Sequence, residues 1–490
     1  MIRTKKVIGI DIGASGGKMA LGEFDGEHLT VREYRNFPNT PQQIGSALYW
    51  DLFALYREVL QGIQYFGAEY GPIDSIGIDT WGASYGLLDR YGRLLEPIYH
   101  YRDLRTADIM QQMNEVCDPW HLFELTGCQC NRTYTLPQLY CYHVTDIPSL
   151  KYADKLLFLP DLLSYFLTGN TDTEQTIAGT SGLMNNQLEG WSKEVAELFD
   201  IPERLYTPII PPATDRGLLI PSIRGFKGLE HTHVIATAGH DSAAAEAAIP
   251  YFDESQLYIS IGTNISMGAE RNASLLTKEA FLHGMKNTGG VGGKKIVYRD
   301  FSACWHINEF VRTRREVGVN YTFEELAKMA KDVKREVPWI DVEDAILNEA
   351  GGDYCKKMDR FFEQTNQRKP ENDAERIRSI YESIVLKICH YTRTFYESGF
   401  AVKKINVISG AVRNEYLMQI ISTFLATDIY ASMPYASLFG NMLVQLTADH
   451  NIRGLSQLRE ISGRSFNVKV YEPMIQKCFE AIEHYESIMT

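Results

Sequence analysis

The segment VIGIDIGASGGKMALGEF, residues 7–24, places a glycine-rich turn between two short apolar runs. Two strand-like runs around a tight turn predict a β-hairpin. Apolar residues recur at helical spacing over residues 50–65, and residues 73–79 and 86–89 have the composition of further strands. Strands that alternate with helices predict an α/β fold.

A second segment of the same kind lies at mid-chain, where QLYISIGTNISMG, residues 256–268, again gives strand, small-residue turn and strand. This recurrence half a chain later predicts an internal duplication at the scale of whole lobes. With 490 residues the chain also exceeds the size of one hydrophobic core. We therefore expect two domains, 1–245 and 246–490, with the boundary near residues 242–255.

The rest of the chain supports this organisation. Residues 377–395 carry an apolar stripe at spacings of three and four, which predicts an amphipathic helix, and residues 405–410 predict a strand that ends in small residues. Residues 208–221, rich in proline and glycine, predict a connecting loop.

Composition limits the function classes. The formal net charge of -13 disfavours a nucleic-acid-binding protein, and no apolar stretch is long enough for a bilayer span, so we expect a cytoplasmic protein. A lone C-x-C pair at residues 128–130 is weak evidence for a metal site. We expect the eight cysteines to be reduced and buried, at positions 117, 128, 130, 141, 304, 355, 389 and 478.

The turn of the first hairpin has the character of a phosphate site. Glycines allow close approach of the backbone to an anion, a preceding carboxylate at Asp11 suits hydrated Mg²⁺, and Lys18 adds positive charge. The spacing matches neither the Walker A motif nor the dinucleotide fingerprint. A plain hairpin turn that needs positive φ explains the same residues equally well.

Two other turns carry candidate chemistry. Gly262-Thr263-Asn264 is a second small-residue turn, and Gly239-His240-Asp241-Ser242 precedes a run of alanines. A carboxylate at Asp241 can accept a proton from an alcohol that attacks phosphorus. From the local spacing alone, Asp241 as a cap of the alanine-rich helix is the better explanation.

Two segments mix aromatic rings with polar groups, as sugar sites do. They are residues 79–82, with Trp81, and residues 101–106, with two arginines. A single tryptophan is more often part of a core, and the charged segment also fits a solvated loop.

Taken together and in order, these segments resemble the FGGY-type carbohydrate kinases, and among them the rhamnulokinase group in particular. The matching motifs span nearly the whole chain: residues 10–15, 73–82, 101–106, 159–161, 167–169, 239–241, 262–263, 436–437 and 440–441.

The resemblance implies two ribonuclease-H-like lobes, as in actin and hexokinase, with a cleft between them for nucleotide and sugar, and it implies ATP and Mg²⁺ as cofactors. It implies that Asp241 is the catalytic base, which overrides the capping explanation, and that Asp11 lies near the metal. The ATP-binding residues that it implies are Ala14, Ser15, Gly16, Gly17, Lys18, Thr263, Asn308, Gly410 and Ala411. The implied substrate-binding residues are Trp81, Gly82, His240, Asp241, Ser242 and Asp300.

The chain departs from the family pattern mainly around the adenosine-binding segment. Ser409 and Ala411 stand where relatives have glycine, Arg413 adds bulk and charge, Tyr435 replaces a glutamate, Asp300 aligns with an asparagine and Asn308 with a glutamine. Phosphoryl transfer is therefore better supported than the identity of the sugar or ATP as the only donor.

The reaction that we expect is ATP-dependent phosphorylation of a sugar hydroxyl, in a ketose such as L-rhamnulose at its 1-hydroxyl. The alternatives are another sugar, such as L-fuculose or a pentulose, and a sugar- or nucleotide-binding protein that has lost catalysis. An actin-like assembly protein would leave the Gly-His-Asp turn without a purpose. We expect small-molecule partners only, and a monomer or homodimer.

Overall fold

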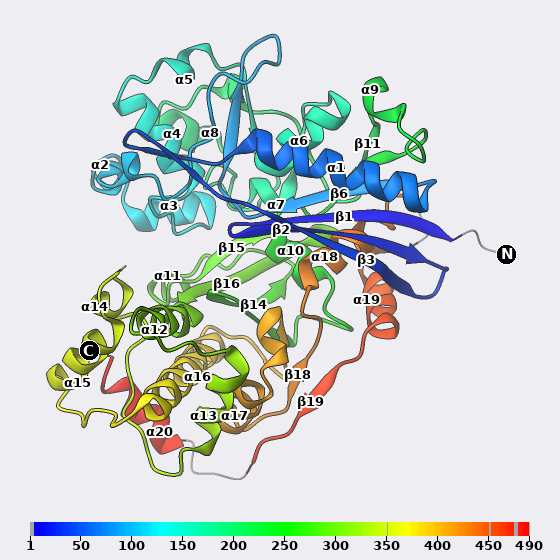
Figure 1. Ribbon diagram of the computed structural model, residues 1–490. Helices are drawn as coiled ribbons and strands as arrows, with labels where there is room; N and C mark the ends of the chain where they lie inside the picture. Colours follow the sequence, from blue (N-terminus) through cyan, green and yellow to red (C-terminus); the bar gives the residue numbers. More distant parts are fainter. Residues whose placement is uncertain (1–3, 350, 450–451, 475–478, 490) are drawn as a thin grey trace. The chain divides into compact units, whose positions relative to one another are not determined.

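A computed structural model of the chain describes residues 4–349, 351–449, 452–474 and 479–489 (Figure 1). Its contacts divide the chain into two compact units. The first unit comprises Met1–Phe252, Glu270–Val297 and Ala436–Phe466, and the second comprises Asp253–Ala269, Tyr298–Tyr435 and Asn467–Thr490. The division of the chain at residues 245/246 stays a prediction.

The first unit is built on a six-stranded mixed sheet, in the order β11-β12-β6-β1-β2-β3. Strand β1 pairs antiparallel with β2 and parallel with β6, β12 is parallel to β6, and the two outer strands are antiparallel to their neighbours. The strands are β1 (Lys5–Gly13), β2 (Gly16–Phe24), β3 (Leu29–Pro38), β6 (Ser75–Thr80), β11 (Thr214–Leu218) and β12 (His233–Ala236). Short strands outside this sheet are β4 (Gln42–Ile44), β5 (Ala47–Tyr49), β7 (Tyr85–Leu88), β8 (Lys155–Phe158), β9 (Thr173–Glu174), β10 (Ile209–Ile210) and β15 (Lys286–Gly289).

The central strands β1 and β6 are buried over most of their length, as expected for strands with helices on both faces of the sheet. Ile8 and Ile10 belong to the core cluster that also holds residues of α1 (Leu52–Tyr70). On the other face, a Cβ at Gly9 would lie 2.8 Å from Met442 of α18 (Ala436–Gln445). Figure 1 shows α1 on one side of the sheet and α18 on the other. The glycine at position 9, between two isoleucines, therefore sets how closely α18 approaches.

The helices of the first unit lie around this sheet and around a second cluster of buried residues. Besides α1 and α18 they are α2 (Ile109–Val116), α3 (Pro119–Thr126), α4 (Thr135–Val144), α5 (Pro148–Tyr152), α6 (Leu159–Thr168), α7 (Gln175–Ala178), α8 (Lys193–Leu198), α9 (Pro221–Arg224), α10 (Asp241–Ala247), α11 (Lys278–Leu282) and α19 (Gly454–Ser465).

The predicted loop over residues 208–221 is wrong in part, because this stretch contains the edge strand β11 and the two-residue strand β10. The pairing of β11 with β12 shifts register between Asp215 and Leu218, and Gly217 has a φ of 90°. An edge strand with a bulge tolerates such residues, since one side of its backbone needs no partner.

The second unit has a matching strand pattern. The seven-stranded sheet runs β15-β16-β14-β13-β17-β18-β19, and within it β13 pairs antiparallel with β14 and parallel with β17. Strand β18 is parallel to β17, and β19 is antiparallel to β18. The strands are β13 (Gln256–Ile261), β14 (Asn264–Arg271), β16 (Lys295–Ser302), β17 (Lys404–Ile408), β18 (Ile429–Ala431) and β19 (Lys469–Tyr471). A hairpin followed by two parallel strands and an antiparallel edge thus recurs in both units, as the duplication predicts.

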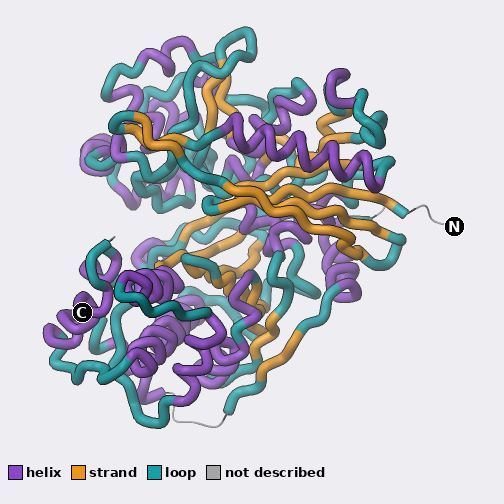
Figure 2. The backbone as a smooth tube through the Cα atoms, in the orientation of Figure 1, coloured by secondary structure: helices purple, strands orange, loops and turns teal. Residues whose placement is uncertain are grey.

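Helices α12 to α17 and α20 complete the second unit, and Figure 2 shows them as one helical group beside the strands. The long α16 contains the predicted stripe over residues 377–395, and nearly all of its apolar side chains are buried. The helices are α12 (Cys304–Glu316), α13 (Phe323–Asp332), α14 (Ala345–Asn348), α15 (Tyr354–Gln364), α16 (Asp373–Glu397), α17 (Glu415–Leu425) and α20 (Phe479–Glu486).

The described cysteines are free thiols, five of them buried and Cys130 and Cys304 partly buried, whereas Cys478 lies outside the described residues. None of the helices in the described ranges has the length and apolar character that a bilayer span requires.

Histidine 306 gives the second unit a pH-dependent stability. His306 is fully buried, its Nε2 lies 2.8 Å from the carbonyl oxygen of Val342, and its Nδ1 lies 2.7 Å from the hydroxyl of Tyr354. Burial lowers the pKa of His306 from 6.5 to about 4. Between pH 6.5 and 4 the His306 imidazole is therefore protonated in the unfolded chain but neutral in the folded chain. The contribution of neutral His306 to the free energy of unfolding is fully present above pH 6.5 and is lost as the pH falls toward 4.

We expect acidification from pH 7 to 4 to cost the folded state roughly 3 kcal/mol through His306 alone. In His306→Gln the amide can still donate a hydrogen bond to the carbonyl oxygen of Val342, but residue 306 no longer titrates. Thermal unfolding of both proteins at several pH values measures the effect, and the variant should lose less stability on acidification. Parallel pH profiles of the two proteins would contradict this assignment.

Candidate active site

Asp11 and Asp79 occupy the same place on neighbouring parallel strands of the first unit. The register of β1 and β6 pairs Gly9 with Gly77 and Asp11 with Asp79. Side chains alternate along a strand, so both carboxylates lie on the face of the two glycines, which is the face that α18 covers. The sequence repeats Ile-Gly-Ile-Asp on both strands, and this repeat places two acids side by side.

Helix α18 supplies hydrogen bonds to both acids. The Ser437 hydroxyl donates to Asp11 Oδ2 at 2.5 Å, and the Asn441 amide donates to Asp79 Oδ2 at 2.6 Å. The Gln445 amide in turn donates to Asn441 Oδ1 at 2.7 Å. These polar side chains are four residues apart, so they line one stripe of the helix. The stripe fixes the two carboxylates from above the sheet.

The pKa values of both acids are raised above the usual value of an aspartate. Burial raises the pKa of Asp11 to about 6, with the hydrogen bond from Ser437 opposing the shift and the charge of Asp241 adding to it. Burial and the neighbouring Asp11 raise the pKa of Asp79 well above its usual value. Asp79 is fully buried and lies beside Asp11 on the neighbouring strand. Asp241 acts on both groups through its charge and therefore belongs to the same cluster.

Asp241 is the first residue of α10, and the residue in the N-cap position is His240. The side chain of His240 forms no capping hydrogen bond. The Asp241 side chain is 31% exposed, its Oδ1 accepts a hydrogen bond from Ser242 at 3.2 Å, and His240 Nε2 lies 3.5 Å away. The carboxylate thus combines partial solvent access with a fixed position in the first turn of α10.

The glycine-rich turn is shaped by crowding and not by unusual backbone angles. None of residues 13–17 has a positive φ. A Cβ at Gly17 would lie 1.9 Å from the ring of Phe37, so only glycine fits there. Ala14 and Ser15 are exposed at the tip, and Lys18 pairs with Asp11 across the hairpin, where its charge lowers the pKa of Asp11. The explanation by positive φ is wrong, and the exposed tip remains free for an anion.

Trp81 and Gly82 follow β6 directly. Trp81 is 8% exposed, packs on Trp50 with ring centroids 4.2 Å apart, and donates its indole N–H to Ser84 at 2.9 Å. A Cβ at Gly82 would lie 2.8 Å from Thr180. The structure thus gives Trp81 a packing role, and its contact with a sugar stays a prediction.

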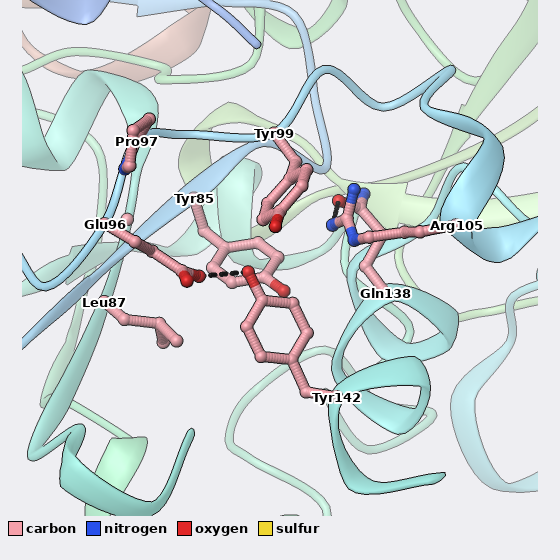
Figure 3. Close-up of a pocket in the computed structure, with 9 residues that line it drawn as sticks. Tyr85, Leu87, Glu96, Pro97, Tyr99, Arg105, Gln138 and Tyr142 are labelled. Atoms are coloured by element: carbon pink, nitrogen blue, oxygen red, sulfur yellow. Dashed lines mark hydrogen bonds between the residues drawn. The ribbon is translucent and has the colours of Figure 1, made fainter. Parts of the chain in front are cut away.

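In the segment at residues 101–106, the side chain of Arg105 is largely buried. Arg105 lies over the ring of Tyr99 at 3.8 Å and donates to Gln138 at 2.9 Å, while Tyr142 donates to Glu96 (Figure 3). The cavity that these side chains line has a volume of about 10 Å³. That is room for about one water molecule, so this pocket does not admit a sugar.

Two of the predicted ATP-binding residues follow β17 in the second unit. Gly410 and Ala411 open the 3-10 helix η4 (Gly410–Arg413), and a Cβ at Gly410 would meet nothing within 4 Å. The preceding Ser409 has φ 76° and ψ -174°, a conformation that is nearly exclusive to glycine and costs about 1–3 kcal/mol. Its hydroxyl lies 2.8 Å from that of Ser260. The backbone shape of a glycine segment is therefore kept although the glycine is replaced.

The other departures in the second unit also have structural partners. Arg413 donates to the hydroxyl of Tyr435 at 2.7 Å, so the two replacements contact each other. Thr263 is exposed in the turn between β13 and β14, and its carbonyl accepts the N–H of Trp305 at 3.1 Å. Asp300 on β16 and Asn308 on α12 are exposed. Their contacts with ligands stay predictions.

The acidic cluster suits a metal that is held mainly by a substrate. Among the residues that the structure describes, no three His, Cys, Asp or Glu side chains are grouped to hold a metal ion. Mg²⁺ in phosphoryl-transfer sites usually takes one or two carboxylates, substrate phosphates and water. A single carboxylate at Asp11, beside the exposed glycine-rich turn, fits that donor set.

Sequence reasoning assigned no role to Asp79, Ser437 or Asn441, although all three lie in motifs that match the family. The repeated Ile-Gly-Ile-Asp could have identified Asp79, because equal patterns on two parallel strands put their acids on one face. No local pattern links Ser437 to Asp11, since 426 residues separate them.

Comparison with known proteins agrees with this arrangement. The N-terminal domain model of the FGGY family of carbohydrate kinases matches residues 6–247, and the C-terminal domain model matches residues 257–448. A rhamnulokinase of Bacteroides thetaiotaomicron is 30% identical over 479 residues, which cover 96% of each chain. A rhamnulokinase of Bacillus subtilis is 28% identical over 468 residues, 95% of this chain and 94% of that protein.

Solved structures share the fold over nearly the whole chain. A xylulose kinase from Rhodospirillum rubrum superimposes with a TM-score of 0.82 at 15% identity, over 99% of this chain and 98% of that one. Plasmodium falciparum glycerol kinase with ADP gives a TM-score of 0.80 at 14% identity, over 99% and 97%. The predicted ribonuclease-H-like α/β fold is confirmed, and the chain belongs to the FGGY family of carbohydrate kinases.

Proposed function

We propose that this carbohydrate kinase transfers the γ-phosphoryl group of ATP to the 1-hydroxyl of a ketose, with L-rhamnulose as the first candidate. The observation that carries the proposal is the partly exposed carboxylate of Asp241 at the start of α10, whose charge raises the pKa values of Asp11 and Asp79. The rhamnulokinase relatives, aligned over almost the full length, favour the sugar.

The mechanism assigns each group a task that its geometry permits. Asp241 accepts the proton of the attacking hydroxyl, while Ser242 and His240, next to it, orient the carboxylate and the sugar. Asp79 lies beside Asp11 on the neighbouring strand, and the Asn441 amide holds its carboxyl group in place. Mg²⁺ at Asp11 would neutralise charge on the transferring phosphoryl group.

The remaining predicted residues are part of the same proposal. Peptide N–H groups of the hairpin turn and Lys18 would bind phosphate oxygens, as tight turns with successive amides do. The proposed nucleotide contacts are Ala14, Ser15, Gly16, Gly17, Lys18, Thr263, Asn308, Gly410 and Ala411. The proposed sugar contacts are Trp81, Gly82, His240, Ser242 and Asp300, with Asp241 as the base.

A screen of sugars tests the substrate. The purified protein is given MgATP and, one at a time, L-rhamnulose, L-fuculose, L-ribulose and D-xylulose, and ADP release is followed with a coupled assay. We expect the highest kcat/KM with L-rhamnulose, and NMR of the product should place the phosphate on carbon 1. A higher kcat/KM with another ketose would overturn the choice of sugar.

The same screen separates a second candidate, a binding protein without catalysis. The replacements at Ser409, Ala411 and Arg413 favour this candidate. Calorimetric binding of a sugar and a nucleotide with no ADP formation across the panel would establish it in place of the kinase.

A further inference from the structure

The backbone immediately before Asp241 is held by buried side chains. The Gly239 N–H donates to Glu174 Oε2 at 2.9 Å, and the His240 N–H donates to Thr176 Oγ1 at 3.2 Å. From the other side, the N–H of Thr80 at the end of β6 donates to the carbonyl of Gly239 at 2.9 Å. Three successive polar groups of this short segment therefore have fixed partners.

Glu174 is at the centre of this arrangement. It is 1% exposed, ends β9 and caps α7, where its carboxylate accepts the N–H groups of Thr176 at 2.8 Å and Ile177 at 3.1 Å. The Thr176 hydroxyl donates to Glu174 Oε2 at 2.6 Å. With Gly239, four donors converge on the two carboxylate oxygens, and a buried acceptor with so many donors is rigidly placed.

A buried ion pair between Asp161 and Arg216 supports the backbone of Glu174. Asp161 Oδ1 accepts the backbone N–H of Glu174 at 3.2 Å and a hydrogen bond from Arg216 at 2.5 Å. Arg216 and Asp161 are both almost fully buried, and Arg216 also lies 2.8 Å from Asp172. Asp161 belongs to the Leu-Pro-Asp stretch that matched the family without a role, and this support accounts for it.

The contact between Glu174 and Gly239 is too close for a side chain at position 239. A Cβ at Gly239 would lie 3.0 Å from Glu174 Oε2 and 3.3 Å from Ile177 Cβ. The carbonyl of His240 accepts the N–H groups of Ala243 and Ala244 at 2.9 and 3.0 Å, so α10 starts from this segment. A shift of the backbone at residues 239–240 is therefore passed directly to Asp241.

From this geometry we infer that Glu174, together with Thr176, is a positioning residue that fixes where the carboxylate of Asp241 projects. The inference rests on the proposed role of Asp241 as the base. Glu174 acts through the backbone and has no contact with the reacting atoms. A base displaced by about 1 Å can cost on the order of 10²-fold in rate, so loss of this contact should appear in the chemical step.

Three variants test the inference. Glu174→Ala removes all four hydrogen bonds, Thr176→Val removes the hydroxyl that joins Glu174 to His240, and Glu174→Gln keeps an oxygen for the Gly239 N–H. We expect kcat to fall by roughly 10- to 100-fold in Glu174→Ala and about 10-fold in Thr176→Val, with KM for ATP within about threefold of the wild type. Glu174→Gln should recover most of the lost kcat.

Glu375→Ala is the matched control. Glu375 is a buried carboxylate of the second unit, paired with Arg368 at 2.9 Å, and its loss should lower the unfolding temperature without changing kcat. The inference about Glu174 is overturned if folded Glu174→Ala and Thr176→Val both keep a kcat within about threefold of the wild type while Asp241→Asn is inactive. That result would leave the proposed role of Asp241 intact. If Glu174→Ala does not fold, Thr176→Val decides. An active Asp241→Asn would instead overturn the proposed role of Asp241.

Discussion

Gly440→Ala is expected to destabilise the first unit by about 3 kcal/mol, among the largest effects of any single substitution in this protein. Gly440 lies on α18 where that helix crosses α10, and a Cβ there would lie 1.7 Å from the carbonyl oxygen of Ala244 and 2.5 Å from its carbonyl carbon. Both atoms belong to the backbone of a buried helix, so no side-chain rotation can relieve the overlap. The two helices must separate, and α18 then withdraws Ser437 and Asn441 from the paired acids.

Thermal unfolding of the variant and the wild type measures this effect. Gly225→Ala is the matched control, because Gly225 belongs to the same unit, has φ -68°, and an added Cβ would meet no atom closer than 3.9 Å. The control should unfold within about 0.5 kcal/mol of the wild type. A Gly440→Ala protein as stable as the control would show that the two helices do not cross this closely.

Asp241→Asn is expected to lower kcat by about 10²–10⁴-fold while nucleotide and sugar still bind. The amide has the size of the carboxylate and still accepts the hydrogen bond from Ser242, so the start of α10 keeps its shape. It cannot take the proton of the attacking hydroxyl. Steady-state kinetics together with calorimetric titration of the nucleotide and the sugar separate turnover from binding.

Asp89→Asn serves as the control for charge removal, because Asp89 lies in an exposed turn of the same unit and accepts backbone N–H groups of Tyr91 and Arg93. Its kcat should equal that of the wild type. A comparable loss of kcat in both variants would point to net charge and not to the base.

Strong local periodicity allowed much of the fold to be predicted from the sequence. The hairpins at residues 7–24 and 256–268 and the helical stripe at residues 377–395 each appear as predicted, because alternating or helical apolar patterns record which face is buried. The error over residues 208–221 has the opposite origin. Proline and glycine are tolerated in an edge strand, so composition alone indicated a loop where β11 pairs.

The candidate site was only partly predictable, because its chemistry depends on contacts between distant parts of the chain. The local sequence of Asp241 favoured a cap, and only the ordered motifs around it indicated a base. The pairing of Asp79 with Asn441 and the contact of Glu174 with Gly239 join segments 362 and 65 residues apart. A pattern within one element carries no information on such contacts, since they follow from strand register and helix packing.

The role of Asp241 as the base is tested most directly by the single-turnover rate of phosphoryl transfer from γ-labelled ATP to the best sugar of the panel, measured by rapid quench. With enzyme in excess over ATP and sugar saturating, this rate reports chemistry without product release. With Asp241 as the base, sugar phosphate should form in one sugar-dependent exponential phase in the wild type, and at a rate at least about 10²-fold slower in Asp241→Asn. Equal single-turnover rates in the two proteins would contradict that role.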